Sequence, residues 1–211
     1  LTHQTNLIKP PVISKDNACL IIFIRNPVPG KVKSRIAETM GIVNAFTIYQ
    51  ELLKVTHDTC LKMHDCSKLL YYSDEILTDD GWDNQIFEKR LQQGFDLGEK
   101  MMNAITENLK KYGSVVLIGS DCPYITMAIL REAFDILENN DMVIGTAEDG
   151  GYYLIGAKAN YPELFKNIDW GSNSVFNQTI EKALNLKVGL LEKLSDIDTE
   201  TDYKRWKTVF E

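Results

Sequence analysis

Short apolar runs alternate along the chain with longer stretches in which apolar residues recur every three or four positions. The short runs predict buried strands, because a strand covered on both faces is apolar throughout. They lie at residues 18–24, 68–73, 115–119, 142–147, 152–157 and 187–191, with a weaker candidate at 86–92. The longer stretches predict helices at residues 44–63, 97–109, 126–137, 174–185 and 199–210. Thr126 and the pair Thr199 and Asp202 are suited to cap two of these helices.

The alternation of strands and helices predicts an α/β fold. We expect three layers, with a mainly parallel mixed sheet between helices on both faces. A single domain is expected over residues 18–211, after a flexible lead-in at 1–17 that lacks the apolar core of a signal peptide. Ligands bind outside the carboxyl ends of the strands in such sheets, so the residues that follow each strand are the site candidates.

Composition and charge narrow the class of function. The chain has 211 residues and a net charge of −7, which argues against general binding to nucleic acids or to anionic membranes. No apolar stretch reaches the ~20 residues that a membrane-spanning helix needs. Four scattered cysteines without a C-x-x-C pair are typical of a reducing cytoplasm, where we expect the protein to act.

One local group of soft ligands is a candidate zinc site. It consists of His57, Cys60, His64 and Cys66, the first three of which would share one face of a helix. The spacing matches no familiar closed zinc site. The favoured alternative is a helix end that carries these residues without a metal.

A concentrated positive loop follows the first predicted strand, in the stretch FIRNPVPGKVKSRI at residues 23–36. Its basic residues are Arg25, Lys31, Lys33 and Arg35. Gly30 allows a close backbone approach, and an extended segment would aim the last three cations at one side. The loop lacks the glycine patterns of dinucleotide folds and P-loops. It predicts a phosphate-binding site, with a solvated surface turn as the alternative.

Acidic residues at two later positions are candidate ligands for Mg²⁺ or Mn²⁺. Asp121 follows the strand at 115–119, in the turn Gly-Ser-Asp-Cys-Pro, and would either bind a metal or cap the turn. Asp196 and Asp198 precede the last helix, where they would either reach a metal or favour the helix N-terminus.

The stretch Glu-Asp-Gly-Gly-Tyr at 148–152 is a candidate substrate-binding turn. Its two glycines would either let a substrate lie against the backbone or form an ordinary turn. The substrate-binding candidates are Asp149, Gly150, Gly151, Tyr152, Trp170 and Ser172. The tryptophan would either stack on a ring or close the core, and core packing is the commoner role.

Six motifs occur in a specific order. They are FIRNPVPGKVKSR at 23–35, QGFDLGEKM at 93–101, LIGSDCP at 117–123, EDGGYYLIG at 148–156, WGS at 170–172 and DIDTETD at 196–202. In these motifs the chain resembles the bacterial GT-A-type glycosyltransferase-like family, also called nucleotide-diphospho-sugar transferases. Some members are assigned to arsenosugar biosynthesis, and the family is related to phospholactate and molybdenum-cofactor guanylyltransferases. The resemblance covers residues 18–206.

The resemblance implies a GT-A fold, a nucleotide held over the first loop and a divalent metal, Mg²⁺ or Mn²⁺. Asp121 of the third motif and Asp198 of the sixth match the metal ligands. Gly94 and Asp96 of the second motif join the basic loop as candidates for nucleotide binding. Lys100 stands where the family more often has arginine, and lysine lacks the bidentate fork of arginine.

Two versions of the expected reaction stay open. In nucleotidyl transfer from a nucleoside triphosphate to a phosphorylated small molecule, Lys33 and its basic neighbours neutralise charge and no base is needed. In glycosyl transfer from a nucleotide sugar to a hydroxyl of a small-molecule acceptor, Asp149 is the candidate base. The alternative class is a non-catalytic nucleotide-binding or partner domain. The acids at both metal positions argue against this alternative. A nicotinamide-dependent oxidoreductase is excluded by the missing glycine pattern.

Overall fold

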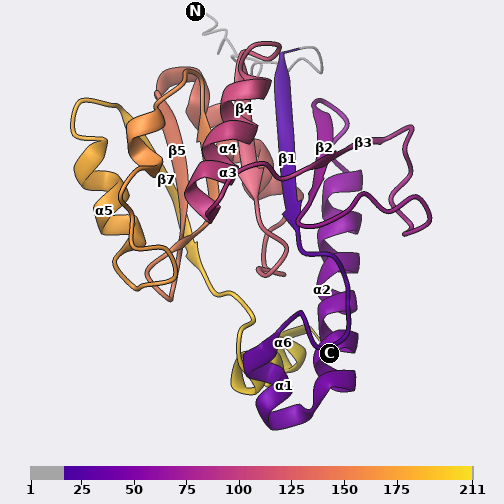
Figure 1. The fold of residues 1–211 in the computed structure, drawn as a ribbon. Coiled ribbons are helices and arrows are strands. Elements are labelled where there is room, and N and C mark those ends of the chain that lie inside the picture. Colours follow the sequence, from indigo (N-terminus) through magenta and orange to yellow (C-terminus); the bar gives the residue numbers. More distant parts are fainter. Residues whose placement is uncertain (1–16, 211) are drawn as a thin grey trace, which may run out of the picture.

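A mostly parallel sheet of seven strands runs through the molecule (Figure 1). The computed structural model describes residues 17–210. The strands are β1 (Ala18–Ile24), β2 (Ser67–Tyr72), β3 (Phe87–Leu91), β4 (Ser114–Ile118), β5 (Met142–Ala147), β6 (Tyr152–Ala157) and β7 (Val188–Leu194). Their order is β3-β2-β1-β4-β6-β5-β7, and β6 is antiparallel to both of its neighbours. The predicted strands are confirmed, the weak candidate at 86–92 included.

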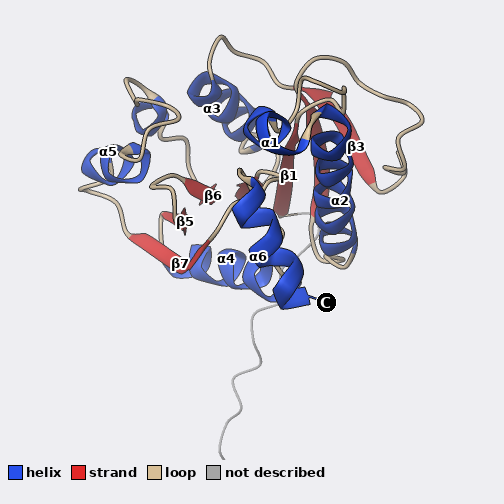
Figure 2. Ribbon diagram, turned by 90° about the horizontal axis from the view of Figure 1, so that it is seen from below, coloured by secondary structure: helices blue, strands red, loops and turns tan. Residues whose placement is uncertain are grey.

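Helices cover both faces of the sheet and make the expected three-layer α/β fold (Figure 2). They are α1 (Ser34–Met40), α2 (Ile42–Leu61), α3 (Leu97–Asn108), α4 (Met127–Asn139), the short 3-10 helix η1 (Pro162–Phe165), α5 (Val175–Lys182) and α6 (Glu200–Phe210). The end of α2 and the length of α4 pack on one face, whereas α3, η1 and α5 pack on the other. The predicted helices are confirmed to within a few residues, and α1 and η1 are additions.

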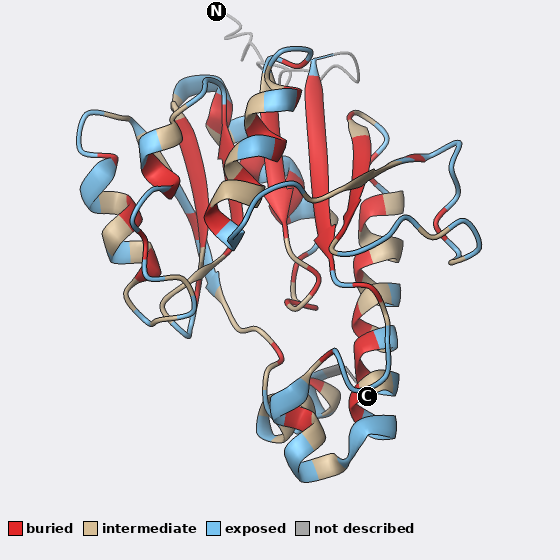
Figure 3. Cartoon of the chain, in the orientation of Figure 1, coloured by how far each residue is buried: buried red, intermediate tan, exposed pale blue. Residues whose placement is uncertain are grey.

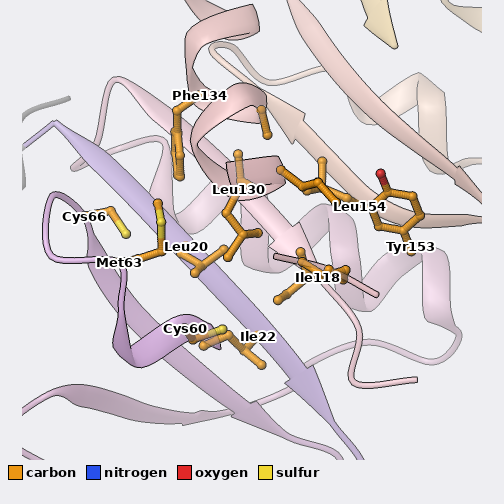
Figure 4. Close-up of a cluster of buried hydrophobic side chains, with 14 of the residues drawn as sticks. Leu20, Ile22, Cys60, Met63, Cys66, Ile118, Leu130, Phe134, Tyr153 and Leu154 are labelled. Carbon is orange, nitrogen blue, oxygen red and sulfur yellow. The ribbon is translucent and has the colours of Figure 1, made fainter. Parts of the chain in front are cut away.

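Alternate residues of each central strand enter opposite cores, which explains why the strands read as continuous apolar runs. In β1, Leu20 and Ile22 enter the core beneath α2 and α4, which Figure 4 shows. Cys19 and Ile21 enter the core beneath α3. All four side chains are buried, as are the central strands in general (Figure 3).

A third, smaller core lies beyond the carboxyl edge of the sheet. Ile36 of α1 packs there against the first half of α2, Ile197 and Trp206 of α6. Figure 1 shows α1 and α6 beside one end of α2, below the sheet. This small core joins the segments after β1 and β7, which lie far apart in the sequence, and so places both at one edge.

Capping follows the predicted pattern in two helices. Thr126 accepts a hydrogen bond from the backbone N–H of Ile129 at the start of α4. At α6, Thr199 and Asp202 accept each other's backbone N–H in a capping box. Because these two residues cap the helix, Asp198 is free of that role.

The predicted lead-in at 1–17 lies outside the described residues, except for Asn17, and stays a prediction. Within residues 17–210, no helix has the length and apolar character needed to cross a membrane.

The His57–Cys66 group does not assemble a metal site among the described residues. His57 packs edge-on against Trp82 and lies beside Phe87. Cys60 is buried in the core on the α2 side of the sheet. The four cysteines of the chain are buried as thiols.

Candidate active site

A cavity of about 630 Å³ opens at the carboxyl edge of the sheet. Its walls are the segments that follow β1, β2, β3 and β4, the start of α3, and residues of β6, whose antiparallel direction brings its first residue to the same edge. Strand β2, which follows β1 in the chain, lies on one side of β1 in the sheet, and β4 lies on the other side of β1. The cavity therefore lies at the point where the strand order reverses, which is where open α/β sheets bind ligands.

The basic loop does not form the extended segment that the alternating cations suggested. Lys31 closes a turn by donating its N–H to Val28 O, after Gly30 at φ 79°. Lys33 then adopts a left-handed conformation at φ 50°, directly before α1 begins at Ser34. The expectation that Lys31, Lys33 and Arg35 point to one side is therefore wrong. Helix α1 was missed because its seven residues are held by the small third core rather than by a long apolar stripe.

The four basic residues of the loop instead lie in three different environments. Arg25 and Lys31 line the cavity. Lys33 is buried, with 5% of its side chain exposed, and Arg35 lies exposed on α1 with its guanidinium 3.5 Å from Asp198. Gly30 supplies the turn and is not part of the cavity wall.

Lys33 connects the two predicted metal ligands. Its ammonium lies 2.7 Å from Asp121 Oδ1 and 3.4 Å from Asp198 Oδ1. It also donates to the backbone oxygen of Ile197 at 2.7 Å. One buried cation thus joins the segments that follow β1, β4 and β7, and the sequence prediction that Asp121 and Asp198 lie close together agrees with this geometry.

Negative charge is concentrated around this lysine. Asp196 lines the cavity, and burial, with the Asp121 carboxylate as the next cause, raises the pKa of its carboxyl to about 7. The charges of Asp149 and Asp198 act in the same direction, and Lys33 opposes them. Acids from three different segments therefore lie close enough together to repel one another.

The donor set fits a divalent cation held by few protein ligands. Asp121 and Asp198 present half-exposed carboxylates to one shared partner. No group of three or more acidic, histidine or cysteine side chains within residues 17–210 is arranged to hold a metal alone. Mg²⁺ at phosphorylated substrates uses one or two carboxylates and completes its shell with water and phosphate oxygens. Two carboxylates beside a cavity that Arg25 and Lys31 help to line suit that mode of binding.

The second motif starts α3 and forms one wall of the cavity. Asp96 is the N-cap, with Oδ1 accepting from the backbone N–H of Glu99 at 2.8 Å. Glu99 Oε2 in turn accepts from the N–H of Phe95 at 2.9 Å. Gly94 leads into this capped helix start with φ 145°, and Lys100 lines the cavity one turn into the helix.

The Gly-Gly turn lies outside the cavity wall, although Tyr152 directly after it belongs to the wall. Asp149 Oδ1 accepts the N–H of Gly151 at 2.9 Å, which closes the turn locally. A Cβ on Gly150 would lie 2.1 Å from Asn173 O, so its close approach is to the protein's own backbone. The turn lies near Asp196, but the Asp149 carboxylate is engaged in the hydrogen bond that closes the turn.

Gly150→Ala is expected to lower the free energy of unfolding by about 3 kcal/mol, because it combines a positive φ of 92° with a backbone clash. Gly171→Ala is the matched control, with φ 88° and no atom within 4 Å of the added Cβ, and should cost about 1 kcal/mol. Urea unfolding of the two variants measures the difference. Equal losses would show that the contact with Asn173 is not tight.

Trp170 and Ser172 lie beside the cavity rather than in its wall. The Trp170 ring makes an edge contact with Tyr152, at 6.3 Å between centroids. A Cβ on Gly98 would lie 2.5 Å from Trp170 Nε1, so the ring packs directly on the first turn of α3. This placement corresponds to the packing role that was weighed for the tryptophan. The Ser172 hydroxyl accepts the backbone N–H of Ser174 and forms a second hydrogen bond with the Ser174 hydroxyl.

Sequence reasoning missed two amides that shape the cavity. Asn26, buried directly after β1, accepts the backbone N–H of Asp74 and donates to Glu75 O, so it holds the segment after β2. Gln92, directly after β3, donates to the backbone oxygens of Ile24 and Tyr71. Each amide follows a strand closely, and this position could have identified both, since the acids and cations of the site were identified from their positions after strands.

Comparison with known proteins identifies similar structures and a family. A protein from Desulfovibrio desulfuricans G20, provisionally described as a nucleotide-diphospho-sugar transferase, is 30% identical, with a TM-score of 0.85 over 94% of this chain and 88% of that one. The inositol-1-phosphate CTP transferase of T. maritima is 12% identical, with a TM-score of 0.59 over 92% of this chain and 95% of that one. The manganese complex of Rv0371c from Mycobacterium tuberculosis H37Rv is 14% identical, with a TM-score of 0.51 over 90% and 97%.

The latter two likenesses show the fold alone, and the first confirms the resemblance stated from the six motifs. No curated protein matches the sequence. Residues 56–172, more than half of the chain, match the family described as "Uncharacterized protein conserved in bacteria" (DUF2064). Because this match spans more than half of the sequence, the protein belongs to the DUF2064 family.

Proposed function

We propose that the protein is a metal-dependent transferase that uses a nucleotide donor and a small-molecule acceptor in the cytoplasm. The observation that carries the proposal is the contact of Lys33 with Asp121 and Asp198 at a cavity whose other walls carry Arg25 and Lys31. Carboxylates for a cation and basic side chains for phosphates then meet at one edge of the sheet. The buried thiols agree with a reducing compartment.

The residues of this site have separate roles in the proposed reaction. Lys31 and Arg25 hold the donor phosphates at the cavity wall. Asp121 and Asp198 hold Mg²⁺ or Mn²⁺, which supplies neutralisation of phosphate charge when bound. Lys33 stabilises the charge that develops on the leaving group, because a preorganised cation in a site with little water stabilises such charge strongly.

Different observations favour each version of the transfer. Nucleotidyl transfer to an acceptor phosphate needs no general base, and Asp149, the candidate base, lies outside the cavity wall with one oxygen engaged in its own turn. The inositol-1-phosphate CTP transferase is a neighbour of that class by its name. Glycosyl transfer is favoured by the description of the Desulfovibrio protein, with which this chain shares the greater identity.

Thermal shifts test the proposal. The purified protein is mixed with each nucleoside triphosphate and a panel of nucleotide sugars, with and without Mg²⁺ or Mn²⁺, because a ligand of the native state raises the melting temperature. Metal-dependent stabilisation by a triphosphate leads to an assay for pyrophosphate release, and stabilisation by a nucleotide sugar leads to an assay for nucleoside diphosphate release. Because either transfer needs an acceptor, both assays include a panel of phosphorylated and hydroxyl-bearing small molecules. Binding without turnover across that panel would identify the non-catalytic class.

Lys31→Ala is expected to weaken nucleotide affinity roughly tenfold at low salt, the loss expected for one charge-assisted hydrogen bond. The loss should shrink as salt is added, because screening weakens contacts between exposed charges. Lys110→Ala, which removes an exposed lysine outside the cavity, is the control. Titration calorimetry at two salt concentrations measures both variants. An equal effect of the two would exclude Lys31 from the phosphate site.

A further inference from the structure

One aromatic side chain at the cavity lies fully in water. Phe95 is 100% exposed although it belongs to the cavity wall. The other aromatic residues of that wall are buried or partly buried, namely Phe23, Tyr152 and Tyr153. The adjacent Leu97 is also exposed and extends the apolar surface at the rim. Among residues 17–210, no packing accounts for an aromatic ring in this position.

The backbone that presents this ring is fixed. The N–H of Phe95 donates to Glu99 Oε2 at 2.9 Å, and Asp96 caps the start of α3 by accepting the N–H of Glu99. Gly94 precedes this start with a φ of 145°, and a Cβ there would lie 2.7 Å from the backbone nitrogen of Lys100. The ring therefore projects from a structured helix start, so a ligand would meet it without ordering the backbone first.

We propose that Phe95 stacks on the nucleobase of the donor, which rests on the proposed use of a nucleotide donor. The charged groups of the same wall suit the other parts of a nucleotide, with Arg25, Lys31 and Lys100 as partners for phosphates. A flat apolar ring matches the base, the planar part of the ligand. Aromatic stacking tolerates any base because every base has a π-face, so Phe95 contributes affinity without selecting the base.

The test compares ligands with and without a base. Binding of the four nucleoside triphosphates and of the matching diphosphates is measured by calorimetry with Mg²⁺, beside tripolyphosphate and pyrophosphate. Phe95→Ala is expected to weaken every nucleotide by about tenfold to a hundredfold, and tripolyphosphate by less than twofold. Phe95→Trp should retain nucleotide affinity, and its new indole should be quenched when a nucleotide binds. Leu184→Ala, which removes another exposed apolar side chain that is not part of the cavity wall, should change the affinity for neither nucleotides nor tripolyphosphate.

The outcomes separate this contact from the proposed function. A wild-type protein that binds neither nucleotides nor tripolyphosphate would overturn both. Nucleotide binding that is unchanged in Phe95→Ala, or no tighter than tripolyphosphate binding in the wild type, would overturn the stacking contact alone. Equal losses for nucleotides and tripolyphosphate would show that the residue shapes the phosphate site instead.

Discussion

Asp121→Asn is expected to lower metal-dependent turnover by about a thousandfold, because the neutral amide is a weak ligand for a divalent cation. A metal at phosphate oxygens contributes several kcal/mol to the stabilisation of the transition state, and about 4 kcal/mol corresponds to this factor. The stabilisation of the protein by nucleotide with Mn²⁺ should also disappear. Turnover and thermal shift, each with and without metal, are the two measurements.

The substitution should leave the fold intact. Lys33 can still donate to an amide oxygen, and the backbone oxygen of residue 121 still accepts the N–H of Ile197. Asp65→Asn is the matched control, because Asp65 resembles Asp121 in its surroundings. The Asp65 side chain is 44% exposed and paired with Arg131, and the Asp121 side chain is 49% exposed and paired with Lys33. A variant at position 121 that keeps its metal dependence would remove this carboxylate from the metal site.

The sheet and its helices could be predicted because their signals are local. In β1 the residues of both faces are apolar, since one set meets the α2 side and the other the α3 side. Helices α2 and α3 carry stripes of several turns that need no knowledge of their partners. The acids and cations of the site were found for a related reason: each follows a strand, and the carboxyl ends of parallel strands meet at one edge.

The details of the site depend on contacts between distant segments, which a sequence pattern does not encode. Ile36 makes α1 helical against Ile197 and Trp206, which lie 161 and 170 positions later in the chain. This short helix turns the basic loop and separates Lys33 from Lys31, against the extended alternation that the sequence suggested. The role of Asn26 likewise depends on residues 73–75, which only the pairing of β1 with β2 brings close.

The Lys33 contacts have a consequence for metal binding in the absence of nucleotide. Its ammonium occupies the space between the two carboxylates that would hold the metal. A second cation bound to both would be repelled by it, because like charges repel at this short range. Lysine and metal therefore compete in the free protein, and donor phosphates offer the ammonium an alternative partner once they bind.

Lys33→Met is accordingly expected to have two effects of opposite sign. Affinity for Mn²⁺ without nucleotide should rise, by roughly tenfold for the loss of one cation–cation repulsion of about 1.4 kcal/mol. Turnover should fall by about a hundredfold to a thousandfold, because the cation that stabilises the leaving group is gone. Paramagnetic resonance of free Mn²⁺ measures the first effect, and product release at saturating metal measures the second.

Lys89→Met is the control, because Lys89 lies away from the site and has contacts similar to those of Lys33. Its side chain is 6% exposed, and it donates to Asp80 at 2.7 Å and to Leu77 O at 2.9 Å. The Asp80 side chain is only 9% exposed, so this control should destabilise the fold more than Lys33→Met does while leaving Mn²⁺ affinity unchanged. A fall in Mn²⁺ affinity in Lys33→Met alone would show that the lysine supports the metal ligands rather than competing for them.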